Sequence, residues 1–164
     1  MQKRFLVVVA SAVAFLMMTA VTSRAQASDP WIGTWKQNIE KSTFISPEGP
    51  KPTVPTVVKL EGAPNGVKIT IDAVNAQGQK THTESVGAFD GTDNPVKGAA
   101  NPNQTSALKK IDARTFENHG KVGGKPTVTN RVTVSADGKT FTVTQSGTNA
   151  QGQAVKSTLV FDKQ

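Results

Sequence analysis

The stretch Val67-Lys68-Ile69-Thr70-Ile71-Asp72 alternates apolar and polar side chains without interruption, and Phe141-Thr142-Val143-Thr144 repeats the pattern. Between residues 126 and 135 the apolar side chains again fall on alternate positions, at Val128, Val132 and Val134. Successive side chains of a strand point to opposite faces, so this period predicts strands with one buried side. No stretch of the chain shows a comparable helical period. The sequence therefore predicts an all-β fold.

Turn signals separate these runs at regular intervals. Asn65-Gly66, Asp90-Gly91 and Asp137-Gly138 are dipeptides typical of tight hairpins. The pentapeptide Asn-Ala-Gln-Gly-Gln occurs twice, at 75–79 and 149–153, and is interpreted as one hairpin turn used twice. Strands are expected near 33–38, 55–61, 67–74, 79–87, 105–111, 114–119, 126–135, 139–147 and 153–162. One of these is expected to be short or irregular, which leaves about eight strands.

The order of strands and turns favours a closed arrangement. Sequential antiparallel strands joined by short turns form a meander, and a long meander tends to close and so remove its edges. Only two connections are long, at 41–53 and 91–104. A β-sandwich needs the same number of strands, but its crossovers require more long connections. The prediction is an up-and-down antiparallel β-barrel.

Residues 1–27 differ in composition from the rest of the chain. Lys3 and Arg4 precede an apolar run over 5–21, and Ala25-Gln26-Ala27 matches a signal-peptidase site. We expect a signal peptide at 1–27, with an uncleaved anchor helix as the alternative, and a barrel domain at 28–164. This domain has 16 Lys and Arg and 12 Asp and Glu, with no cysteine in the chain, so disulfides are impossible. The expected location is periplasmic or secreted, with no membrane span after cleavage.

Several motifs resemble those of a known group of proteins. Gly33-Thr34-Trp35 matches the Gly-x-Trp signature of lipocalins and related calycin barrels. The motifs at 33–36, 41–44, 89–98, 108–112, 137–140, 147–153 and 161–164 resemble those of small exported bacterial proteins described as lipocalin-like. Asn94 departs from the aromatic residue expected at its position. The resemblance implies a lipocalin-like barrel and an exported location, and it implies no activity.

The same resemblance implies that Gly33 and Trp35 lie at the closed end of the barrel, where the tryptophan acts as a plug. We expect Trp35 to be buried beneath a basic side chain from a late strand. Arg131 is the first candidate and Lys156 the second, because a guanidinium stacks well on an indole face. Trp31 is expected to be more exposed, although it could instead be the plug.

The remaining aromatic side chains have two interpretations. They either fill a packed interior or partly line a cavity near the open end, as in barrels that carry small molecules. In the second case the candidate ligand-binding residues are Phe44, Phe89, Phe116, Asn130 and Phe141. Gln145 and Ser157 are further polar positions that could face the interior.

Support for catalysis or metal binding is weak. His82 and Glu84 are two residues apart and therefore share a strand face, where they could form an acid–base pair or bind a metal. A solvent-facing strand is the favoured explanation of both residues, and no third ligand is evident. The lysines are scattered and do not alternate with aromatic residues, which argues against a nucleic-acid surface. No cofactor is expected.

The leading hypothesis is an exported β-barrel that binds a small apolar or amphipathic ligand. The alternative is an envelope-associated interaction or structural module with a packed interior. The volume of the interior separates these two hypotheses. The oligomeric state cannot be read from the sequence.

Overall fold

The computed structural model describes residues 29–45, 51–64, 66–75, 77–149 and 152–164, and within them it contains ten strands and no helix. The signal peptide expected at 1–27 lies outside the described residues. The strands are β1 (Gly33–Ile45), β2 (Val57–Ala63), β3 (Gly66–Val74), β4 (Lys80–Gly87), β5 (Asp90–Pro95), β6 (Gln104–Lys110), β7 (Thr115–Val122), β8 (Lys125–Val134), β9 (Thr140–Thr148) and β10 (Ala154–Lys163).

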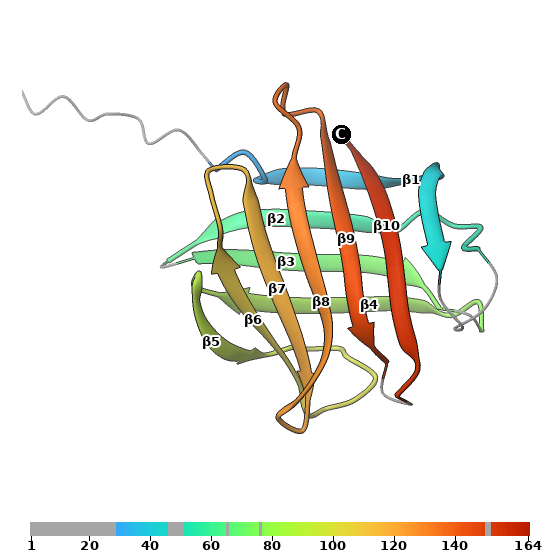
Figure 1. Cartoon of the computed structure of the whole chain (residues 1–164), viewed down its shortest axis with the longest axis vertical. Helices are drawn as coiled ribbons and strands as arrows, with labels where there is room; N and C mark the ends of the chain where they lie inside the picture. The colour runs from blue at the N-terminus through green and yellow to red at the C-terminus, as the bar shows by residue number, and fades with distance from the viewer. Residues whose placement is uncertain (1–28, 46–50, 65, 76, 150–151) are drawn as a thin grey trace, which may run out of the picture.

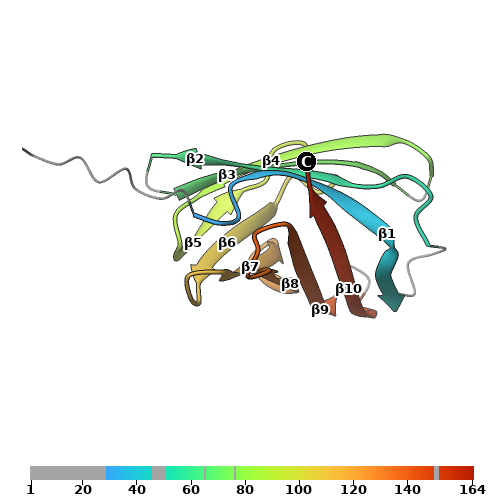
Figure 2. The same ribbon diagram turned by 90° about the horizontal axis from the view of Figure 1, so that it is seen from above.

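All ten strands form one antiparallel sheet in the order β4-β3-β2-β1-β10-β9-β8-β7-β6-β5. Strands that follow one another in the chain are paired neighbours, except β4 and β5, which form the two edges of the sheet; β1 pairs with β10 as well as with β2. Figure 1 shows β1–β4 running across β6–β10, and Figure 2 shows the two layers that result. The predicted antiparallel β-barrel is confirmed as a nearly closed barrel.

The barrel is incomplete only between β4 and the β5–β6 region. There Glu84 and Lys97 form an isolated bridge, in which each backbone N–H donates to the other residue's carbonyl, at 3.0 and 2.8 Å. Gly98 follows this bridge and lies against the carbonyl of His82. We call this contact the seam.

The strand count of about eight is wrong, because the structure has ten. The prediction omitted β5, whose sequence Asp-Gly-Thr-Asp-Asn-Pro has no apolar side chain and resembles a loop. Its pairing with β6 extends from Asp90 to Pro95 and contains an irregularity before Asp93. Neighbouring strands stabilise this segment where its own composition does not.

β1 also runs farther than the predicted 33–38, because side chains hold it across a bulge between Asn38 and Thr43. The Ser42 hydroxyl donates to the Asn38 carbonyl at 2.7 Å and accepts from the Val160 N–H at 3.0 Å. Asn38 Nδ2 donates to Asp162 Oδ2 at 2.8 Å. These bonds take the place of the missing ladder, so the strand resumes its pairing with β10 beyond the bulge.

The two copies of the pentapeptide close the β3–β4 and β9–β10 hairpins in the same way. Asn75 and Asn149 each donate a backbone N–H to the glutamine carbonyl four residues later, at 2.9 Å in both turns. Each asparagine Oδ1 also accepts the backbone N–H of that glutamine. The interpretation of one turn used twice is confirmed for the described residues of both copies.

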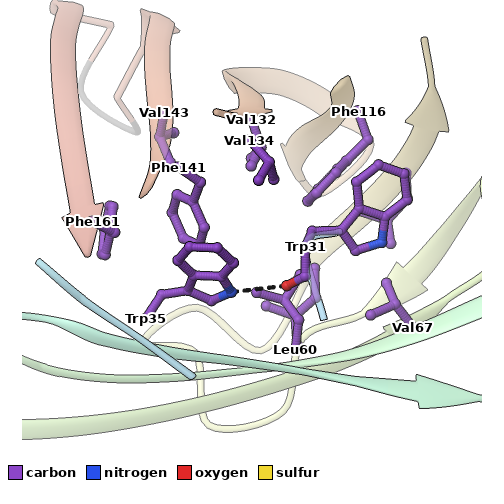
Figure 3. Close-up of a cluster of buried hydrophobic side chains, with 12 residues drawn as sticks. Trp31, Trp35, Leu60, Val67, Phe116, Val132, Val134, Phe141, Val143 and Phe161 are labelled. Carbon is purple, nitrogen blue, oxygen red and sulfur yellow. Dashed lines mark hydrogen bonds between the residues drawn. The ribbon is translucent and has the colours of Figure 1, made fainter. Parts of the chain in front are cut away.

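The apolar side chains gather in one end of the barrel (Figure 3). Trp31 and Trp35 are both fully buried, and Trp35 Nε1 donates to the Trp31 carbonyl at 2.8 Å. The Trp35 ring packs on Phe141, with ring centroids 4.6 Å apart, as expected for a plug. The expectation that Trp31 is more exposed is wrong, because its ring packs on Phe116 at 5.3 Å and also on Phe89.

The basic side chain over Trp35 is Lys163, whose Nζ lies 5.0 Å from the ring centroid. Both Arg131 and Lys156 are wrong for this role, since each is adjacent in its strand to buried residues, Val132 in one case and Val155 and Ser157 in the other, and so points outward. The register of β7 and β8 places Arg131 opposite Glu117, and Nη1 of Arg131 donates to Glu117 Oε1 at 2.8 Å. Lys163 is the direct partner of Trp35 in the β1–β10 ladder, so both side chains lie on the inner face.

Gly33 makes room for this stack. Its φ is +140°, a conformation that side chains disfavour, and a Cβ there would lie 2.9 Å from Lys163 Cε. The glycine of the Gly-x-Trp motif therefore has a structural role here, because the absence of a Cβ at Gly33 lets Lys163 lie over the Trp35 indole.

Candidate functional site

The other half of the barrel interior holds a cavity of about 450 Å³. Side chains from β3, β4, β6, β7, β8 and β9 line it, and Asn149 lies where it reaches the β9–β10 turn. Among the described residues the lining contains no charged and no aromatic side chain. It consists of hydroxyls, amides, aliphatic side chains and one glycine. This cavity is the candidate functional site.

One wall of the cavity carries a row of three amides, which we call the amide row: Asn118, Asn130 and Gln145. These residues are direct cross-strand partners, Asn118 with Asn130 between β7 and β8, and Asn130 with Gln145 between β8 and β9. Residues paired in this way on one face of a sheet have side chains close enough to interact. The row therefore crosses three neighbouring strands, with its three side chains at the same height along the barrel.

Two hydrogen bonds hold the amide row in place. Gln145 Nε2 donates to Asn130 Oδ1 at 3.1 Å, and the Ser106 hydroxyl donates to Asn118 Oδ1 at 2.7 Å. Both asparagine oxygens thus have a protein partner. Three other groups of the row have no hydrogen-bond partner among the described residues. They are the side-chain NH₂ groups of Asn118 and Asn130 and the Oε1 atom of Gln145.

The opposite wall combines aliphatic side chains with hydroxyls. Ile69 and Ile71, on β3, line the cavity there beside their β4 ladder partners Ser85 and Thr83. Within the ten-strand order, β3 and β8 are five strands apart in either direction, so β3 lies across the barrel from β8, the strand that carries Asn130 (Figure 1). The amide row therefore faces an aliphatic patch formed by Ile69 and Ile71.

The sequence-predicted ligand-binding residues divide between the two halves of the barrel. Asn130 lines the cavity, as does Gln145. Phe116 and Phe141 belong to the buried apolar cluster, and Phe89 packs against it. Phe44 is the β-ladder partner of Ser157, between β1 and β10. The described lining of the cavity includes none of these four phenylalanines.

Sequence reasoning missed Asn118 and Ser106. The signal for both was available in the alternation, because a buried Phe116 implies that Asn118 also faces inward. The same holds for Ser106, two residues before the buried Leu108.

His82 and Glu84 lie on the outer face of β4, and neither lines the cavity. His82 Nδ1 lies 2.7 Å from Asp72 Oδ1, and its Nε2 lies 3.8 Å from Glu84 Oε1. Glu84 also pairs with Lys68, and the hydrogen bond from this lysine holds the pKa of Glu84 below its ordinary value. Within the described residues no group of three acidic, histidine or cysteine side chains could hold a metal ion.

The hydrogen bond to Asp72 raises the pKa of His82 above its ordinary value, and the charge of Glu84 contributes less. The extra stability is therefore complete below the unfolded-state pKa of about 6.5 and is lost as the pH rises through the raised folded-state value. We expect Asp72→Asn to lower the pKa of His82 in an NMR titration of its ring. Asp112→Asn, a remote change, is the control. An unchanged His82 titration in Asp72→Asn would contradict the assignment.

No helix in the described part of the chain is long and apolar enough to cross a membrane. Comparison of the chain with protein-family models, curated proteins and solved structures finds no match. The resemblance to lipocalin-like proteins therefore stays a prediction.

Proposed function

We propose that this chain is a lipocalin-like binding protein that holds a small uncharged amphipathic molecule in the open half of its barrel. The observation that carries the proposal is the cavity of about 450 Å³, which falls in the range of about 300–1,000 Å³ usual for ligand sites. We further propose that the protein is exported after removal of residues 1–27.

The chemistry of the lining supports an uncharged ligand. An ionised group transferred into this half of the barrel would lose water and find no opposite charge among the described lining residues. Amides and hydroxyls can instead satisfy the hydrogen bonds of a neutral polar group. The aliphatic patch at Ile69 and Ile71 suits an apolar portion of the same molecule.

The alternative, an interaction module with a packed interior, has less support. The apolar end is packed around Trp31 and Trp35, but the opposite end leaves the cavity open. Binding is favoured over catalysis because the two acid–base candidates predicted from the sequence, His82 and Glu84, point outward from β4 and do not line the cavity.

Native mass spectrometry of the full chain, purified gently from its own host, tests the proposal. We expect a retained small molecule on the wild-type protein. Ser85→Phe fills the cavity from β4 and should abolish retention. Val86→Phe is the matched control, because Val86 is the next residue, is 50% exposed and points outward.

Two results would overturn the proposal. One is a wild-type protein that carries no bound molecule. The other is equal retention by Ser85→Phe and Val86→Phe, which would place the bound molecule outside the cavity.

A further inference from the structure

We infer that the amide row recognises a carboxamide or lactam group on the ligand. This inference rests on the proposed function, because it names the chemical class of molecule that the cavity takes. Its basis is the arrangement of Asn118, Asn130 and Gln145 on three adjacent strands, all facing one cavity.

The unused hydrogen-bonding groups of the row include both donors and an acceptor. Asn118 and Asn130 present NH₂ groups, and Gln145 presents Oε1, without a partner among the described residues. A ligand group that only accepts, such as a ketone or an ester, leaves the glutamine oxygen unpaired. A group that only donates leaves the two NH₂ groups unpaired. Leaving such a group unsatisfied away from water costs free energy.

A carboxamide meets both requirements with one planar group. Its carbonyl oxygen accepts from an asparagine NH₂, and its own N–H donates to Gln145 Oε1. A single hydroxyl can also donate and accept, but from one atom. The amide carries the two functions on separate atoms, as the row does, so it can contact two neighbouring strands at once.

The row also selects against charge. A carboxylate would find donors at Asn118 and Asn130 but no cation in the described lining, and it would repel the acceptor at Gln145. An ammonium ion would find the acceptor but no carboxylate. Either ion loses its hydration without an opposite charge, which disfavours its binding relative to the neutral amide.

The opposite wall indicates what the rest of the ligand is. Ile69 lies deep in the barrel, only 6% exposed, and borders both the cavity and the apolar cluster. A ligand whose amide contacts the row across β7–β9 therefore directs its remainder toward β3. We infer a short aliphatic portion, because the described lining has no aromatic ring for stacking.

Four probes of matched size test this inference: hexanamide, hexanoate, heptanol and heptylammonium. Each is titrated into ¹⁵N-labelled protein, and the side-chain NH₂ resonances of Asn118, Asn130 and Gln145 are followed by NMR. We expect saturable shifts of these resonances with hexanamide. Its dissociation constant should be at least about tenfold lower than that of either ion, and also lower than that of heptanol.

Asn130→Asp provides the decisive variant. The aspartate can still accept the hydrogen bond from Gln145 Nε2, so the row keeps its internal bond, but it loses a donor and gains a charge. At about pH 8 we expect hexanamide to bind about tenfold more weakly and heptylammonium about tenfold more tightly. Thr144→Asp is the matched control, because it places the same charge on the exposed face of β9, one residue before Gln145.

Equal affinity for hexanamide and heptanol, or an unchanged preference in Asn130→Asp, would overturn the inference. So would the same change in preference in Thr144→Asp, because the charge would then act without the cavity. If hexanoate or heptanol binds in the cavity while hexanamide does not, the amide class fails and the binding function survives. If no probe shifts the row and no molecule is retained by the wild-type protein, both fail.

Discussion

Trp35→Ala is expected to lower the free energy of unfolding by about 3–5 kcal/mol, as large aromatic truncations in cores do. Trp35 is fully buried against Phe141, lies beneath Lys163 and donates a hydrogen bond to the Trp31 carbonyl. Trp31→Ala is expected to cost a similar amount, because Trp31 is equally buried. Denaturant melts measure both losses, and Val86→Ala, on the exposed outer face, serves as the control.

The two tryptophans differ in one respect that a milder substitution can isolate. Trp31 Nε1 is buried without a hydrogen-bond partner among the described residues, whereas Trp35 Nε1 donates to the Trp31 carbonyl. Trp31→Phe removes an unsatisfied donor, while Trp35→Phe leaves a carbonyl without its partner. Trp35→Phe should therefore be the more destabilising of the two, by about 1–2 kcal/mol. A larger loss in Trp31→Phe would contradict this account of the closed end.

The alternation of side chains was sufficient to predict the fold class. The period-two runs in β3, β8 and β9 identify an inner and an outer face, and the short hairpins at Asp137-Gly138 and in the two pentapeptides imply antiparallel neighbours. β5 could not be predicted, because its polar sequence becomes a strand only by pairing with β6. Long-range pairing of this kind is absent from the local pattern.

The candidate site was only partly predictable, for a related reason. The sequence indicates that Asn130 and Gln145 face inward, and the cavity includes both. It does not indicate how far along the barrel each inward residue lies. That level depends on the strand register, which brings Asn130 beside Asn118 and Gln145 but places Phe116 and Phe141 in the packed end. Arg131 is excluded for a simpler reason: the alternation that buries Val132 and Val134 places it on the outer face of β8, whereas Lys163 is the ladder partner of Trp35.

A second large effect is expected at the seam, where Gly98→Ala should destabilise the barrel by about 2–4 kcal/mol, from backbone strain and overpacking together. Gly98 has φ +74°, and a Cβ there would lie 2.1 Å from the His82 carbonyl oxygen. This atom belongs to the backbone of β4 and cannot turn aside as a side chain would. The 96–103 segment must therefore move away from β4, and the adjacent Glu84–Lys97 bridge should weaken with it.

Gly138→Ala is the matched control, since Gly138 has φ +70° but no atom within 4 Å of the position its Cβ would take. It should lose only about 1 kcal/mol, the cost of the left-handed conformation alone. The difference between the two variants thus measures the close approach at the seam. Hydrogen exchange locates the effect, because the amide protons of Glu84 and Lys97 should exchange faster in Gly98→Ala and at the wild-type rate in Gly138→Ala. An equal loss of unfolding free energy in the two variants, with both amides still protected, would contradict this account. It would mean that the backbone at the seam accommodates a Cβ while the Glu84–Lys97 bridge stays intact, and that the bridge contributes little to closing the barrel.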